Sequence, residues 1–253
     1  MPQPRPGHSY PRLVRYAGKD SLADSMGLPS RGLAYAVEQL RALERPRVPV
    51  FANIGGFSAD EIAASLFAVE PYVAGVEISL MCPNVPRAAE TFDAVELLRQ
   101  ILERTKNRTK PAIVRVPNDT ARSAQLVDLV ECCVDGGIDG IKIAGGRPVE
   151  ESGLGAKRGT LHGTMVFETA LDNLKRAAAV ARGRIPIKAN GGVRSGGDVL
   201  TMLQAGATCV DLYSAFIYQG WGVARRINLE LAALLRARNA AAVATSQTSR
   251  AGA

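Results

Sequence analysis

Histidine and cysteine are scarce in this chain, and neither is spaced as in a metal site. The 253 residues include two histidines and four cysteines. The cysteines, which follow no metal-ligand or disulfide spacing, are Cys82, Cys132, Cys133 and Cys209. The sequence therefore predicts no metal centre, and its thiols favour a reducing compartment. Cys132 and Cys133 fall in a predicted helix and Cys209 begins a predicted buried strand, so we interpret these three as packing residues.

Long apolar runs and clustered charge are also missing. No apolar run is long enough to cross a bilayer, and the proline-rich, polar start does not have the pattern of a signal peptide. The net charge is +7 and the pI about 9.5, but the basic residues are dispersed and no basic stripe carries interleaved aromatics. We therefore expect a cytoplasmic protein with no transmembrane segment that does not bind nucleic acid. Peripheral association with a membrane is left open.

A regular alternation of two hydrophobic periods is present instead. The predicted strands are residues 48–54, 76–80, 112–116, 138–143, 185–189 and 209–213. The predicted helices are residues 30–44, a segment that opens at the capping box Ser58 to Glu61, and residues 88–105, 120–134, 167–182, 196–205 and 221–238. Near-continuous apolar strands alternating with helices predict a parallel sheet that is covered on both faces. The first strand-to-helix turn lacks the third glycine and the acidic partner of a dinucleotide fingerprint, so a (β/α)8 barrel is favoured over a doubly wound sheet.

Three segments follow from this pattern. Residues 1–29 are predicted to be irregular, with at most a short ribbon around residues 12–16. Residues 30–238 form the barrel domain and include a long glycine-rich loop over residues 144–164. Residues 239–253, rich in Ala, Ser and Thr, are predicted to be disordered.

Two loops at strand ends carry candidate chemistry. Cys82, Pro83 and Asn84 follow the strand at residues 76–80, and a thiol at the carboxyl end of a buried strand is a better catalytic choice than a packing choice. Gly191 and Gly192 follow the strand at residues 185–189 and lead into a helix whose N-terminus can bind an anion. The next strand ends at Tyr213 and Ser214 in the same way. Consecutive strand ends of this kind form the phosphate site of (β/α)8 barrels. The simpler interpretation is that these glycines only make turns, and the pairing of two such loops counts against it.

These motifs resemble the dihydroorotate dehydrogenase family of FMN-dependent (β/α)8-barrel enzymes. The resemblance lies in residues 77–86, 111–115, 189–193 and 212–215, and extends from about Pro4 to Arg236. It implies that Cys82 takes a proton from a ring carbon of the substrate while a hydride passes from the neighbouring carbon to FMN. The implied reaction is the oxidation of dihydroorotate, or a related dihydropyrimidine, to orotate in pyrimidine biosynthesis.

The resemblance also assigns the binding residues. The cofactor-binding residues that it implies for FMN are Asn53, Arg115, Lys142, Gly191, Gly192, Tyr213 and Ser214. The substrate-binding residues that it implies are Asn84, Ser79, Met26 and Gly27. His162 lies in a segment that resembles one covering the flavin, and a packing role is favoured over a catalytic one.

Several positions depart from the family pattern. Ser79 stands in place of an asparagine, and Arg115 replaces a lysine with a different geometry. Ala144, Gly145 and Gly146 replace a Thr-Asn-Thr segment, and Asp24 begins a segment that departs from Asn-Arg-Met-Gly-Phe. Because the altered positions are substrate contacts or their neighbours while the phosphate loops are kept, FMN is better supported than dihydroorotate.

Relative to the family, about six β/α units are expected and the first two strands are missing, so the barrel is incomplete. The strands at residues 48–54 and 209–213 would then expose unpaired edges. In order of preference, the true start lies upstream, a homodimer or other partner chain supplies the missing strands, or the chain is a remnant. A stop codon just before Met1 would refute the first explanation. The alternative functions are a truncated or split-barrel flavin-binding protein without independent activity, and a non-flavin barrel enzyme for a phosphorylated metabolite, against which the Cys82 loop argues.

Strand parity predicts one ion pair. Side chains alternate between the two faces of a strand, so Glu77 shares the face of Ser79, and Lys142 that of Ala144. If that face is the barrel interior, both charges are buried and each needs a partner, so we predict a Glu77–Lys142 pair. Lys188 either covers the flavin phosphate or reaches a solvated end.

Overall fold

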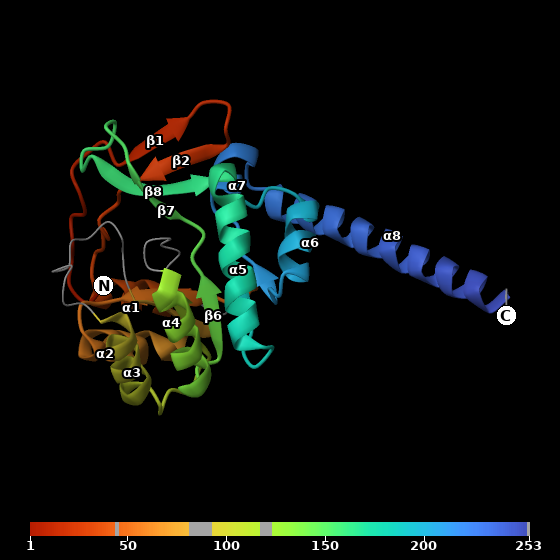
Figure 1. Ribbon diagram of the computed structural model, residues 1–253. Coiled ribbons are helices and arrows are strands. Elements are labelled where there is room, and N and C mark those ends of the chain that lie inside the picture. Colours follow the sequence, from red (N-terminus) through yellow and green to blue (C-terminus); the bar gives the residue numbers. More distant parts are fainter. Residues whose placement is uncertain (44–45, 81–92, 117–122, 252–253) are drawn as a thin grey trace.

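The computed structural model describes residues 1–43, 46–80, 93–116 and 123–251. Two sheets organise this part of the chain (Figure 1). The larger sheet has six parallel strands in the order β10-β9-β6-β5-β4-β3. The strands are β3 (Phe51–Gly55), β4 (Gly75–Ser79), β5 (Ala112–Val116), β6 (Gly140–Ile143), β9 (Ile187–Ala189) and β10 (Cys209–Val210). The predicted parallel sheet is confirmed, and the predicted strands differ from these only at their ends.

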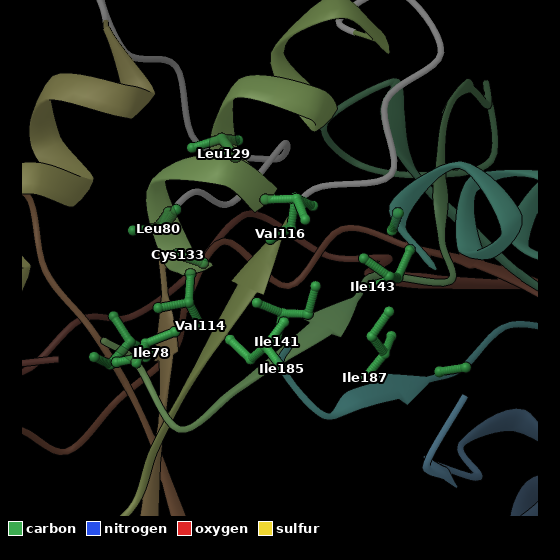
Figure 2. Close-up of a cluster of buried hydrophobic side chains, with 14 of the residues drawn as sticks. Ile78, Leu80, Val114, Val116, Leu129, Cys133, Ile141, Ile143, Ile185 and Ile187 are labelled. Atoms are coloured by element: carbon green, nitrogen blue, oxygen red, sulfur yellow. The ribbon is translucent and has the colours of Figure 1, made fainter. Parts of the chain in front are cut away.

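One face of this sheet is covered by helices and forms the core. The helices are α1 (Leu33–Arg41), α2 (Ala59–Val69), α3 (Ala94–Arg104), α4 (Ser123–Asp135), α5 (Phe167–Ala181), α6 (Gly196–Gln204), α7 (Ser214–Gln219) and α8 (Val223–Ala251). Figure 2 shows Ile78, Val114 and Ile141 from three neighbouring strands in the same buried cluster as Leu129 of α4. All four are fully buried. Each such side chain contributes about 1.5–3 kcal/mol of hydrophobic free energy.

The alternate residues of the same strands point to the opposite face, which we call the inner face. In β4 the core-facing residues are Val76 and Ile78, so Glu77 and Ser79 lie on the inner face. The parallel register places Ser79 opposite Arg115, Arg115 opposite Lys142, and Lys142 opposite Lys188. On β4, β6 and β9 the period of two therefore separates an apolar core face from an inner face that carries Glu77, Lys142 and Lys188.

The edges of the large sheet are β3 and β10, and no pairing joins them within the described residues. The predicted exposed edges are thus present, and barrel closure is not seen in this part of the chain. Cys209 is exposed on β10, which corrects its interpretation as a packing residue. The reason is that an edge strand has no neighbour to cover its outer side.

The second sheet corrects two sequence-based predictions. Residues 1–29 contain β1 (Leu13–Tyr16), where a short ribbon was predicted, and also β2 (Ser21–Asp24), which was not predicted. The predicted loop at 144–164 contains β7 (Arg147–Glu150) and β8 (Arg158–Gly163). These four strands form an antiparallel sheet in the order β1-β2-β8-β7. Two hairpins, β1–β2 and β7–β8, pair strands that are close in sequence. Only the pairing of β2 with β8 joins the two hairpins into one sheet.

Helix ends follow local chemistry more closely. Ser58 caps α2, since its Oγ accepts a hydrogen bond from the Glu61 amide at 3.2 Å. Ser195 and Asp198 form a capping box at the start of α6. Such caps contribute about 1 kcal/mol each.

The C-terminal tail was predicted to be disordered, and this is wrong as far as Ala251. Helix α8 continues from Val223 to Ala251 and extends away from the body of the molecule (Figure 1). The tail is rich in alanine, which has the highest helix propensity of all residues. This alanine content favours a helix over disorder.

Candidate functional site

Four charged side chains form a closed ring on the inner face. The Lys142 ammonium lies 3.0 Å from Glu77 Oε1 and 2.7 Å from Asp211 Oδ2. The Lys188 ammonium lies 2.8 Å from Glu77 Oε2 and 3.3 Å from the same Asp211 oxygen. Each lysine therefore contacts both carboxylates. The predicted Glu77–Lys142 pair is confirmed, whereas Lys188 joins the ring and does not reach a solvated end.

The ring keeps Glu77 and Lys188 ionised despite their burial. Glu77 is only 5% exposed, and this burial by itself raises the pKa of its carboxyl group. Lys142 and Lys188 outweigh burial, so the pKa of Glu77 lies below its ordinary value. Burial lowers the pKa of Lys188, but Glu77 and Asp211 outweigh that effect and raise it. Opposite charges within hydrogen-bond distance favour the charged form of both partners.

Asn53 and Ser79 extend the ring towards β3. The Asn53 amide nitrogen donates to Glu77 Oε1 at 2.8 Å, and the Ser79 hydroxyl donates to the Asn53 oxygen at 3.2 Å. These two bonds fix which end of the Asn53 amide faces which neighbour. The structure thereby brings together three of the predicted site residues, which are Asn53, Ser79 and Lys142.

Four further predicted residues line one pocket at the ends of β9 and β10. Gly191, Gly192, Tyr213 and Ser214 surround this small cavity, whose volume is about 20 Å³. Asp211 and His162 also line this pocket. The two predicted phosphate loops therefore meet, as expected for consecutive parallel strands.

The backbone at this pocket suits an anion. Gly191 and Gly192 have φ angles of 126° and 71°, which favour glycine. A Cβ on Gly192 would lie 2.6 Å from the Gly163 carbonyl oxygen, so a larger residue would not fit. Within the described residues, the amide N–H groups of these two glycines donate to no protein acceptor. The buried Asn190 Oδ1 next to them has no hydrogen-bond partner. Free donors and a free acceptor beside one pocket fit a ligand that carries both a phosphate and hydroxyl groups.

A second polar cluster stands beside the pocket. His162 Nε2 lies 3.1 Å from Asp24 Oδ2, and the Tyr213 hydroxyl donates to the same oxygen at 3.4 Å. Burial, together with Asp24, raises the pKa of Tyr213 to about 12. The tyrosine is therefore a hydrogen-bond donor at neutral pH.

The remaining predicted residues that the structure describes belong neither to the ion ring nor to the pocket lining. Arg115 lies on the inner face between Ser79 and Lys142, and it forms no ion pair with any described residue. Met26 and Gly27 follow β2 and pack against His8, whose amide donates to the Met26 carbonyl at 3.0 Å. Cys82 and Asn84 lie outside the described residues.

Two charged members of the site were not predicted from the sequence as site residues. Asp211 lies two positions after Cys209, and the period of two would have placed both on the inner face. Asp24 begins the segment that departs from the family pattern, and the sequence assigns it no role in the site. Its contact with His162 depends on the β2–β8 pairing, for which the sequence carries no local signal.

The described residues contain no group of three or more His, Cys, Asp or Glu side chains that could hold a metal ion. Among them there is likewise no helix both long enough and apolar enough to span a membrane.

Comparison with known proteins agrees with this arrangement. The family model described as dihydroorotate dehydrogenase matches residues 1–235. A "Dihydroorotate dehydrogenase (quinone)" of Chloroflexus aurantiacus is 30% identical over 249 residues, covering 89% of this chain and 68% of that protein. A protein of the same description from Kineococcus radiotolerans is 32% identical over 258 residues, covering 91% of this chain and 69% of that protein. The crystal structure of "ligand-free type DHODH" from Eimeria tenella superposes with a TM-score of 0.83 at 22% identity, covering 94% of this chain and 76% of that one. The chain therefore belongs to the dihydroorotate dehydrogenase family.

Proposed function

We propose that this chain is an FMN-dependent oxidoreductase that oxidises dihydroorotate, or a related dihydropyrimidine, to orotate in pyrimidine biosynthesis. The observation that carries the proposal is the pocket where the ends of β9 and β10 meet beside the polar inner face. Membership of the family supports the same reaction.

The residues at the pocket suit FMN. Gly191 and Gly192, with Tyr213 and Ser214, would hold the phosphate, because their backbone donors converge on one pocket. Asn190 Oδ1 would accept a hydrogen bond from a ligand hydroxyl, since it lacks a protein partner. When bound, FMN supplies the hydride acceptor.

The inner face would orient the reacting groups. Asn53, held by Glu77 and Ser79, presents an amide of fixed orientation towards the cofactor. Lys142 is neutralised by two carboxylates, so its field at the site is weaker than the sequence suggests. Arg115 has no carboxylate partner among the described residues, and we assign it the role of the inner-face cation that attracts an anionic group.

The remaining roles rest on the family pattern. Cys82 Sγ would take the proton from the substrate, which requires at least partial thiolate character. Asn84, Ser79, Met26 and Gly27 would contact the substrate. Arg115 favours the thiolate if it lies near Cys82.

Purified protein tests the proposal. We expect yellow protein that releases FMN, and bleaching of the flavin absorbance when dihydroorotate is added without oxygen. Cys82→Ala should retain the colour but bleach at least about 100-fold more slowly, since general base catalysis contributes about this much or more. Flavin that no dihydropyrimidine reduces would favour a flavin-binding protein without independent activity. Protein that binds no flavin would overturn the proposal.

A further inference from the structure

Asp24, His162 and Tyr213 come from three distant parts of the sequence and meet at one carboxylate oxygen. Asp24 ends β2 and is 8% exposed, and His162 lies in the neighbouring strand β8. Both His162 Nε2, at 3.1 Å, and the Tyr213 hydroxyl, at 3.4 Å, approach Asp24 Oδ2. The two rings pack edge to face with centroids 5.1 Å apart. Asp24 thus fixes the position of two side chains that line the phosphate pocket.

The second nitrogen of His162 is not used by the protein. The ring lines the pocket together with Gly191, Gly192 and Ser214. Its Nε2 faces Asp24, and its Nδ1 has no hydrogen-bond partner among the described residues. An imidazole nitrogen on a pocket wall without a partner is a site for a ligand atom.

Gly146 gives this ring its space. A Cβ on Gly146 would lie 2.4 Å from Thr160 Cγ2, 2.7 Å from His162 Cε1 and 3.0 Å from His162 Nδ1. The imidazole and the Thr160 methyl group together therefore occupy the volume that any side chain at position 146 would need. Glycine at position 146 therefore allows His162 to occupy its observed position.

We propose that His162 is a phosphate-binding residue, whose Nδ1–H donates to the terminal phosphate of FMN while Asp24 holds the ring from the opposite side. The proposal rests on the proposed function and names one more residue of that site. In this arrangement both N–H groups of the ring point at negatively charged oxygens, one of Asp24 and one of the phosphate, so both hydrogen bonds are charge-assisted. The other carboxylate at the pocket, Asp211, is already matched by Lys142 and Lys188 and offers little repulsion. Asp24 is a positioning residue, because it acts through His162.

Comparing FMN with riboflavin isolates the phosphate, because riboflavin lacks only that group. The Kd of each is measured by flavin fluorescence titration of the full-length apoprotein. For His162→Phe, which keeps a flat ring but no donor, we expect the Kd for FMN to rise about tenfold to hundredfold. The Kd for riboflavin should change less than about threefold. Equal weakening of both ligands, or no weakening of FMN, overturns the proposal.

Two glycines provide a matched test that leaves His162 in place. Gly146→Ala should push the ring aside and cause the same selective loss of FMN affinity. Gly222→Ala is the control, because a Cβ there meets no atom within 4 Å. Asp24→Asn should weaken FMN selectively but less than His162→Phe does, and weakening of both ligands would contradict its positioning role. If His162→Phe fails to fold, Gly146→Ala decides. Wild-type protein that binds neither ligand refutes the proposed function as well, whereas FMN binding that none of these changes affects refutes only this inference.

Discussion

At the scale of single residues, the ion ring explains how this chain tolerates charge on the inner face of a sheet. Glu77 is nearly inaccessible, and an isolated carboxylate in such a place would lose its hydration at a cost of several kcal/mol. Two ammonium groups and the Asn53 amide replace the lost water. A ring with two carboxylates and two lysines is neutral overall, so removing one member leaves the others mismatched.

Glu77→Gln should therefore lower the free energy of unfolding by about 3 kcal/mol, because it leaves two buried ammonium groups facing one carboxylate. Urea denaturation measures the change. Lys106→Ala is the control: its pair with Glu103 is exposed, so a change within about 0.5 kcal/mol is expected. The double variant Glu77→Gln/Lys142→Met should lose less than the sum of the two single losses. Additive losses would show that the ring is not a coupled unit.

The same residue gives a pH dependence whose sign is fixed. The pKa of Glu77 is lower in the folded protein than its ordinary value of 4.5, owing to Lys142 and Lys188, which outweigh burial. Its stabilising contribution is therefore complete above that ordinary value and is lost as pH falls through the lower folded pKa. We expect the stability difference between wild type and Glu77→Gln to be constant from pH 8 to pH 6 and to shrink below about pH 4.5. A difference that grows on acidification would contradict the lowered pKa.

At the scale of elements, the start of α6 shows how closely two helices pack. The Gly196 amide donates to Glu230 Oε2 of α8 at 2.7 Å. A Cβ on Gly196 would lie 2.4 Å from the Leu231 backbone nitrogen. The next residue, Gly197, has only Ser195 Oγ nearby, at 3.6 Å from an added Cβ. Adjacent glycines in one helix therefore have opposite packing requirements.

Gly196→Ala should destabilise the fold by about 2 kcal/mol, because backbone must move to admit the methyl group. Gly197→Ala should be neutral or stabilise by up to about 1 kcal/mol, since alanine is the better helix former and meets no clash. Thermal unfolding of the two variants checks the pair. Equal effects at both positions would contradict the close approach of α6 and α8.

The elements that depend on local interactions were predicted correctly, and those that depend on long-range pairing were not. The parallel strands and their helices were predicted because hydrophobic period and capping are local properties, as at Ser58 and Ser195. The antiparallel sheet was missed because Ser21–Asp24 and Arg158–Gly163 pair across more than a hundred residues. Neither strand has an alternating pattern strong enough to identify it alone: Ser21–Asp24 is buried at every position.

At the scale of the whole molecule, helix α8 has one half that packs against the body and another half that projects from it. Its first turns contact the body, with Val223 and Ile227 buried. Residues 236–240 are exposed, and towards its C-terminus the helix extends away from the body (Figure 1). The far end of α8 therefore contributes little to the stability of the body.

Deleting residues 241–253 should leave the Tm of the body unchanged within about 2 °C, since a change of 1 kcal/mol shifts Tm by about that much or more in a domain of this size. Circular dichroism should show a small loss of helix at low temperature. Calorimetry of the two proteins gives the comparison. A large fall in Tm would mean that this end of α8 packs against a surface, for example that of a second copy.

The sequence alone determined the parallel sheet, the alternation of core-facing and inner-face residues along its strands, and the two consecutive strand ends with candidate phosphate loops, because each depends on residues close together in the chain. The same alternation placed Glu77 and Lys142 on one face, and that sufficed to predict their pairing. Only the tertiary structure decided that Lys188 and Asp211 close the ring and that Asp24 reaches His162, since these contacts depend on which strands are neighbours in each sheet. The interaction between two charges depends on the distance between them in space, and the sequence pattern alone does not give that distance.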